Sequence, residues 1–459
     1  MECLFKRDTF KIVLMVLVCL LSNVILLYAE VKKSRRVSLS FKKALQLAFK
    51  HNRDIAVQEN EIRITEAKLL EAKGKFLPQI DFDSSYIHRD SVMNLGLSQG
   101  KDSDKDLGVF VGYEDEKSVG ISVKQPVFEG GSNMANLRQA KLELEMQRER
   151  LRALRLSVEF ETKRLYYGIL LAQDSERIAE ELLNQAKSHY EIVKKKFKEG
   201  TASKFDLFQA KVQVSKVFPK VVRAENSKKF IISEFKKLIG LKQEDYIVLK
   251  DELTYSFIDL DENRFLEIAY KRNPELIIKS LNVKLGRNNI SIAKAASRPH
   301  INVNFNCAYR SDDVTDMFNS RHNNWNVGVV VSLPLFDRFS AKAKVEKAKA
   351  RYSQAELRES DNKRAIALSI KKALLDLRQA QVIIKSQKEV LKEAEEAVKI
   401  AEARYRNGVG RGIDVLDAQV SLSQIKNNLS QAIYDYVMAE SYLNKVVGGN
   451  LFMEGKYEE

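Results

Sequence analysis

Two aspartates near the C-terminal end of the sequence have a spacing that could bind a cation. Asp414 and Asp417 stand three residues apart, after a turn in which Gly408, Gly410 and Gly412 occupy three of five positions. Side chains three residues apart lie on one face of a helix. If several chains bring such carboxylates together in a ring, the like charges raise the pKa of one another and the ring binds cations well. The alternative is that Asp414 only caps the helix that begins there, while Asp417 is solvated.

The rest of the sequence contains no recognisable catalytic or metal-binding pattern. The five histidines are scattered, and no metal-ligand pair, phosphate-binding loop or nucleophile elbow is present. We therefore expect no enzyme activity, no cofactor and no metal centre. The formal net charge is +15, but Lys and Arg alternate with Glu along helical stretches. This pattern indicates solvated helix faces rather than a nucleic-acid site.

The aspartates belong to the tip of a long helical hairpin that occurs twice in the chain. The segments 132–199 and 340–407 contain no proline, and apolar residues stand at every seventh position from Leu137 to Val193. A heptad row of this length indicates coiled-coil packing. Gly200 with Asp206 matches Gly408 with Asp414 at an offset of 208. We expect the hairpin tips at these two glycines.

The hairpins are part of a longer internal repeat. Residues 45–52 reappear at 266–273 with an offset of 221, which becomes 208 from Pro126 and Pro334 onward. The sequence predicts a first repeat over 30–240, a linker over 241–259, a second repeat over 260–448 and a tail over 449–459.

Each repeat also contains one pair of segments with alternating polarity. These lie at about 78–90 and 116–128, with an expected surface loop between them, and at about 299–310 and 324–336. Ten-residue strands of this kind suit a transmembrane β-barrel or the edge hairpin of a soluble sheet. The long helices and the export signal described below favour the barrel. Four strands cannot close a barrel, so several chains must share one.

The N-terminus has the features of a cleaved signal peptide over residues 1–29. Lys6, Arg7 and Lys11 precede an apolar run, and Tyr28-Ala29 offers a cleavage end. A retained membrane anchor is the alternative. Removal of this segment would leave Cys307 as the only thiol, so we expect no intrachain disulfide.

The motifs in both repeats resemble those of the TolC family of outer-membrane efflux proteins. They are Ala44-Leu-x-Leu-Ala, Leu77-Pro-Gln-Ile, Gln125-Pro-Val-Phe-Glu-Gly-Gly, Tyr405-x-x-Gly and Asp414-Val-Leu-Asp-Ala. The resemblance implies a mainly α fold with a membrane β part, in which a homotrimer closes a 12-stranded barrel in outer-membrane lipid. A long α-helical coiled-coil tunnel would cross the periplasm. The implied function is a passive exit duct in tripartite efflux or type I secretion.

The resemblance also assigns roles at the tips. Asp414 and Asp417 match the paired aspartates of the channel constriction, and Asp206 matches an aspartate that helps to hold the tip closed. The family places an Arg two residues after the tip glycine, whereas here Arg411 comes one residue later. With Asp206, Arg411 and Tyr405 are the candidates for the closed-state latch. Gly200 and Gly408 are the expected docking points for a periplasmic adaptor (membrane fusion) protein that joins the duct to an inner-membrane pump.

A periplasmic coiled-coil adaptor or scaffold is the alternative function. Such a protein would carry one hairpin flanked by β-rich soluble domains. Two hairpins interleaved with amphipathic strand pairs favour the duct.

Overall fold

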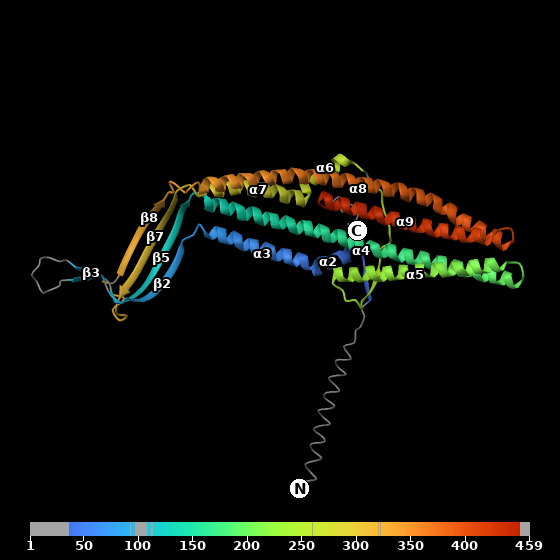
Figure 1. The fold of residues 1–459 in the computed structure, drawn as a ribbon, viewed down its shortest axis with the longest axis horizontal. Coiled ribbons are helices and arrows are strands. Elements are labelled where there is room, and N and C mark those ends of the chain that lie inside the picture. Colours follow the sequence, from blue (N-terminus) through green and yellow to red (C-terminus); the bar gives the residue numbers. More distant parts are fainter. Residues whose placement is uncertain are drawn as a thin grey trace, which may run out of the picture. The chain divides into compact units, whose positions relative to one another are not determined.

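The protein is described by a computed structural model that covers residues 36–91, 93–96, 108–111, 113–258, 260–319, 321 and 323–449. The expected signal peptide and all but the first residue of the expected C-terminal tail lie outside these residues. Most of the described chain is helical, and long helices alternate with strands (Figure 1).

Both repeats contain, in this order, two helices, two strands of ten or more residues and two longer helices, to which the first repeat adds three short strands. The first repeat holds β1 (Arg36–Leu39), α2 (Phe41–His51), α3 (Arg53–Gly74), β2 (Gln79–His88), β3 (Met93–Gly96), β4 (Gly108–Val111), β5 (Asp115–Glu129), α4 (Ser132–Lys198) and α5 (Lys204–Ile239). After β6 (Tyr246–Leu249), the second repeat holds α6 (Glu262–Arg272), α7 (Pro274–Ala295), β7 (His300–Ser311), β8 (Asn323–Ser332), α8 (Ser340–Arg406) and α9 (Gly412–Val447). Helices α2 and α6 begin at equivalent positions of the two repeats, and so do α4 and α8. The starts of α2 and α6 differ by 221 residues and those of α4 and α8 by 208, which are the two offsets found in the sequence.

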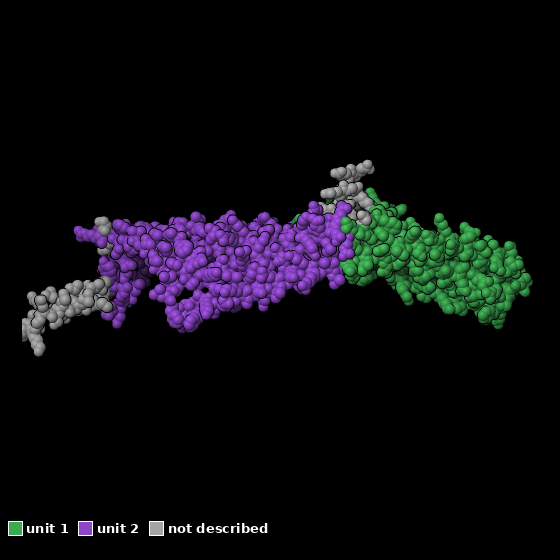
Figure 2. All heavy atoms as spheres, turned by 90° about the horizontal axis from the view of Figure 1, so that it is seen from above, with its two compact units in different colours: residues 1–53, 155–261, 371–445 green, residues 54–154, 262–370, 446–459 purple. Residues whose placement is uncertain are grey.

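The compact units of the fold do not follow the repeats. Unit 1 contains residues 1–53, 155–261 and 371–445, and unit 2 contains residues 54–154, 262–370 and 446–459 (Figure 2). Each unit therefore takes segments from both repeats. The sequence boundaries near residues 240 and 260 separate the repeats and not the compact units.

Unit 2 contains a four-stranded antiparallel sheet in the order β2-β5-β7-β8. Phe82 is opposite Ile121, Ile121 is opposite Cys307, and Cys307 is opposite Trp325, so these four side chains form one row across the sheet. Phe82 and Trp325 are 70% and 64% exposed. Further exposed apolar side chains of the same alternating set are Ile80, Phe305, Val327, Val329 and Val331. The sheet thus has one apolar face that is exposed in the single chain, and β2 and β8 form its edges.

Two short sheets lie where the sequence predicted only a loop and a linker. Strands β3 and β4 pair with each other inside the segment 90–116. Strand β6, inside the expected linker, pairs in parallel with β1. Asp251 follows β6 and accepts hydrogen bonds from the backbone N–H of Phe41, at 2.8 Å, and from the hydroxyl of Tyr166, at 2.7 Å. The segment between the repeats is therefore packed structure.

Helices α4 and α8 each contain 67 residues. The buried residues of α4 include most of the heptad row seen in the sequence. In α4 the buried positions at heptad spacing are Leu144, Val158, Leu165, Ala172, Ala179, Ala186 and Val193. None of the described helices is both long and apolar enough to span a membrane.

Candidate functional site

The candidate site consists of the two hairpin tips, both in unit 1. Helix α4 ends at Lys198 before Gly200, and α8 ends at Arg406 before Gly408. Gly200 and Gly408 have φ values of 75° and 80°, which residues with a side chain rarely adopt. An added Cβ at either glycine would meet nothing within 4 Å. Both glycines thus lie at open surfaces of the tips.

Asp414 is held within its own tip. The guanidinium of Arg411 donates to Asp414 Oδ1 at 2.8 Å, and the Arg411 backbone N–H donates to Asp414 Oδ2 at 3.4 Å. The hydrogen bond from Arg411 holds the pKa of Asp414 below its usual value. The exposed carboxylate of Asp417 lies one turn further, and both aspartates raise the pKa of Arg411. Asp414 therefore does contact the backbone near its helix start, and the two carboxylates share one face with Arg411.

Asp206 is the first-repeat counterpart of Asp414, and it forms a capping box with Ser203. The Asp206 backbone N–H donates to Ser203 Oγ at 3.1 Å, while the Ser203 backbone N–H donates to Asp206 Oδ2 at 3.1 Å. The two acceptors satisfy N–H groups that a helix start leaves free. Within the described chain, no hydrogen bond or ion pair joins Asp206 to Arg411. The single chain thus pairs each with a residue of its own tip.

Tyr405 links the two hairpins. Its side chain is 8% exposed and packs with Val193 of α4, Ala210 of α5 and Val415 of α9. Burial, and then the charge of Asp206, raise the pKa of Tyr405. Of the latch candidates, Tyr405 is therefore the one that the structure places between the hairpins.

Lys196 is a further residue of this contact. Its Nζ donates to the backbone carbonyl of Tyr405 at 2.6 Å and lies 4.5 Å from the centre of the Tyr405 ring. This carbonyl belongs to the last turn of α8, where backbone acceptors lack helical partners and favour a cation. Lys196 is the last of three consecutive lysines in the sequence, so nothing in the pattern distinguishes it from its neighbours.

A second residue that sequence reasoning missed is His189 of α4, which is 5% exposed. Its ring lies 4.9 Å from that of Tyr405, and a Cβ on Gly412 would lie 3.4 Å from its Nε2. Burial lowers the pKa of His189. The histidine lines a cavity of about 310 Å³ with Gln419, whose amide donates to Glu402 at 3.0 Å.

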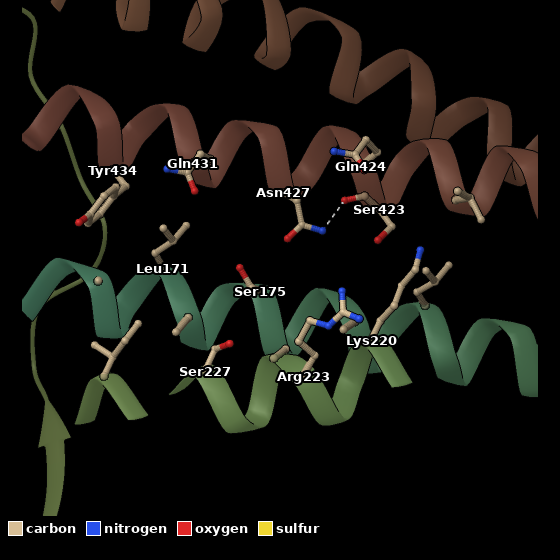
Figure 3. Close-up of a pocket in the computed structure, with 17 residues that line it drawn as sticks. Leu171, Ser175, Lys220, Arg223, Ser227, Ser423, Gln424, Asn427, Gln431 and Tyr434 are labelled. Atoms are coloured by element: carbon tan, nitrogen blue, oxygen red, sulfur yellow. Dashed lines mark hydrogen bonds between the residues drawn. The ribbon is translucent and has the colours of Figure 1, made fainter. Parts of the chain in front are cut away.

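Further from the tips, α4, α5 and α9 enclose a groove of about 650 Å³ (Figure 3). Lys220 and Arg223 extend into it from α5, and α9 contributes Ser423 and Asn427. Beside it, Lys426 of α9 pairs with Glu181 of α4 at 3.0 Å. The groove thus presents hydroxyl, amide and cationic groups. In the described part of the chain, no cluster of three or more His, Cys, Asp or Glu side chains could hold a metal ion.

Comparison with known proteins agrees with this architecture. The alkaline protease secretion protein AprF of Pseudomonas aeruginosa is 21% identical over 331 residues, which cover 72% of this chain and 69% of AprF. The outer membrane protein TolC of Vibrio cholerae is 21% identical over 287 residues, which cover 62% of this chain and 66% of TolC. These identities are low, but they extend over most of the chain.

Solved structures share the fold. The crystal structure of CusC has a TM-score of 0.77 at 20% identity, with 89% of this chain and 92% of CusC covered. The outer membrane protein VceC of Vibrio cholerae has a TM-score of 0.76 at 17% identity, with 89% and 96% covered. The sequence model that describes outer membrane efflux proteins matches residues 44–240 and 265–449, one segment in each repeat. Because that match covers most of the chain, this protein belongs to the outer membrane efflux protein family.

Proposed function

We propose that three copies of this chain form a passive exit duct through the outer membrane, with most of each chain in the periplasm. The observation that carries the proposal is the four-stranded sheet with one exposed apolar face and two free edges. An apolar face of this kind suits lipid, and the polar face suits a water-filled lumen. Free strand edges cannot remain unpaired in a membrane. We infer the export function from the membership in the outer membrane efflux protein family.

The number of strands supports assembly into a closed ring. Four strands are too few for a barrel, for which eight is about the practical minimum. Three copies that join β8 to β2 would supply twelve strands. The hairpins of the three chains would then line one tunnel, and no catalytic role is needed for such a duct.

The tips would form the gate. Asp414 and Asp417 share a face with Arg411, and three copies would bring six of these carboxylates together at one end of the tunnel. Tyr405 would hold the closed state with Asp206 and Arg411, which are free to exchange partners between copies because both are at exposed tips. A periplasmic adaptor would dock at Gly200 and Gly408, and its inner-membrane pump would deliver the substrate.

Native mass measurement in mild detergent tests the assembly. We expect a species of three chains extracted from outer-membrane fractions, with strands β2 and β8 protected from hydrogen exchange. A monodisperse monomer whose edge strands are protected would contradict the proposal, since the edges would then be satisfied without neighbours.

A further inference from the structure

The turns that follow strands β5 and β8 share a backbone conformation but not residue types. After β5, Gly130 and Gly131 have φ values of 61° and 89°. At the equivalent positions after β8, Arg338 and Phe339 have φ values of 56° and 65°. They are the two non-glycine residues with positive φ in the described chain. A residue with a Cβ is disfavoured in this left-handed region, most of all a bulky one.

Contacts within the single chain do not explain the two bulky residues. Phe339 is 69% exposed, and its ring contact is with Phe336, itself 74% exposed, at a centroid distance of 5.8 Å. Leu335, in the same segment, is 91% exposed. A strained backbone that carries exposed apolar side chains indicates contacts outside the chain.

In the first repeat, the same turn is buried against the end of α7. A Cβ on Gly130 would lie 2.5 Å from the carbonyl oxygen of Ala295 and 3.0 Å from the Cβ of Arg298. Arg298 donates from Nη1 to the carbonyl oxygen of Gly130 at 3.2 Å. Ala295 is 2% exposed. This intrachain junction, made by Gly130, Gly131, Ala295 and Arg298, therefore needs a glycine in the turn and places its arginine on the helix end.

The counterparts of this junction are both open in the single chain. At an offset of 221, Gly74 corresponds to Ala295 and Leu77 corresponds to Arg298. A Cβ on Gly74 would meet nothing within 4 Å, and Leu77 is 65% exposed. Arg338 and Phe339 form the other open half. Compared with the intrachain junction, the residue types are exchanged: the glycine is at the end of the helix and the arginine is in the turn.

We infer that Arg338 and Phe339 of one copy pack on Gly74 and Leu77 of the next copy. Within the chain, β5 pairs with β7, and the intrachain junction joins the end of β5 to the helix that leads into β7. Pairing of β8 with β2 of a second copy would bring the end of its α3 to the turn after β8 in the same way. Gly74 presents no side chain to the turn. The two copies must nevertheless lie slightly further apart than the two sides of the intrachain junction, where a Cβ on Gly130 would come within 2.5 Å of the Ala295 carbonyl oxygen. Arg338 then supplies from the turn the guanidinium that Arg298 supplies from the helix end.

Disulfide cross-linking tests this contact, which rests on the proposed trimer. In the intrachain junction the corresponding Cβ positions are 3.0 Å apart. A disulfide joins Cβ atoms about 3.5–4.5 Å apart, so the slightly wider contact between copies brings equivalent cysteines within its reach. In a chain whose native cysteines are replaced, Leu77→Cys with Arg338→Cys should give covalent trimers after oxidation. A mixture of the two single variants should give covalent dimers, and each single variant alone should remain monomeric on a denaturing gel.

The outcomes separate the inference from the proposed function. A native trimer without cross-links above the single-variant background overturns the inference and leaves the trimer intact. That result is also the one expected if the turn lies in lipid instead of against a second copy. If no trimer forms in the unmodified protein, the proposed assembly itself fails.

A charge exchange provides an independent test without cysteines. Leu77→Arg places a second guanidinium beside Arg338 and should reduce the fraction of trimer that survives detergent. Adding Arg338→Gly recreates the residue types of the intrachain junction and should restore that fraction. Leu70→Arg, at an exposed position earlier on α3, is the control and should leave the trimer unchanged. An equal loss in the double variant would overturn the inference.

Discussion

Ser203 and Arg411 occupy equivalent positions, three residues before the two tip aspartates. Both aspartates accept from the backbone N–H of this residue, but the side-chain donor differs: a hydroxyl for Asp206 and a guanidinium for Asp414. The guanidinium of Arg411 and the carboxylate of Asp414 are 80% and 43% exposed. Exposed ion pairs are screened by water and contribute little to stability. Arg411 can therefore leave Asp414 for a neighbouring copy at low cost, which suits a gate that must open.

Lys196→Met should loosen the closed tip. It removes the hydrogen bond to the Tyr405 carbonyl and the contact with the Tyr405 ring, both between the two hairpins. A hydrogen bond from a charged group contributes about 1.5–3 kcal/mol, and partial exposure of Lys196 places the loss at the lower end. We expect longer open times in single-channel recordings. Lys195→Met, an exposed neighbour, is the control, and equal open times in both variants would show that Lys196 does not hold the tip.

His189 should make the stability of the tip depend on pH. Burial lowers its pKa, the charge of Glu402 partly opposes this, and the charge of Lys196 adds to it. Over the interval below the ordinary pKa of about 6.5, the unfolded chain binds more protons than the folded chain. The contribution of His189 to the free energy of unfolding is therefore complete above that interval and is lost as the pH falls through it.

Thermal unfolding of the helical signal at pH 5.5 and pH 7.5 measures this effect. His189→Gln should shift less between the two pH values than the unmodified protein. His51→Gln, at an exposed position at the end of α2, should shift as much as the unmodified protein. If His189→Gln keeps the full shift, other groups carry the pH dependence.

At the scale of elements, the sequence predicts what depends on local periodicity. The heptad row of α4 and the alternating polarity of strands β2, β5, β7 and β8 can be recognised in the sequence because the same kind of contact recurs at a fixed spacing. Strands β1 and β6 have four residues each, and nearly the whole first repeat separates them, so they are too short and too distant for any periodic signal. The pairing of β3 with β4 inside a Gly- and Asp-rich segment was hidden because those strands are equally short. Tertiary pairing decides such elements, not intrinsic propensity.

Tyr166→Phe should destabilise the attachment of the segment between the repeats. The buried hydroxyl donates to Asp251, which also accepts from Phe41 at the start of α2. Removing it leaves a carboxylate with one fewer donor, at a cost of about 1–3 kcal/mol. We expect a lower midpoint of thermal unfolding. Tyr434→Phe, whose hydroxyl has a 3.5 Å contact with the Arg164 carbonyl, is the control, and equal midpoints would contradict the role of Asp251.

Across the whole molecule, the sequence repeats and the compact units divide the chain at different positions. Each compact unit combines segments of both repeats, so neither repeat folds as a separate body. The intrachain junction at Gly130 and the open halves at Gly74 and Arg338 follow from this arrangement. One junction closes within the chain and its counterpart requires another copy. The sequence offsets identify the equivalent residues of the two junctions. Only the positive φ values and the exposed side chains of the structure show that the second junction has no partner within the chain.

The assembled protein is proposed to be a duct whose narrow end is lined by the tip aspartates. Single-channel current across a lipid bilayer tests it, with divalent or trivalent cations added on the side of the hairpin tips. We predict a conducting trimer that these cations block, because six carboxylates at one end of the tunnel would bind them. In Asp414→Ala with Asp417→Ala, the trimer should persist and the block should disappear. Inserted trimers that carry no current would contradict a duct, and a block that is unchanged in the double variant would show that these aspartates do not line its narrow end.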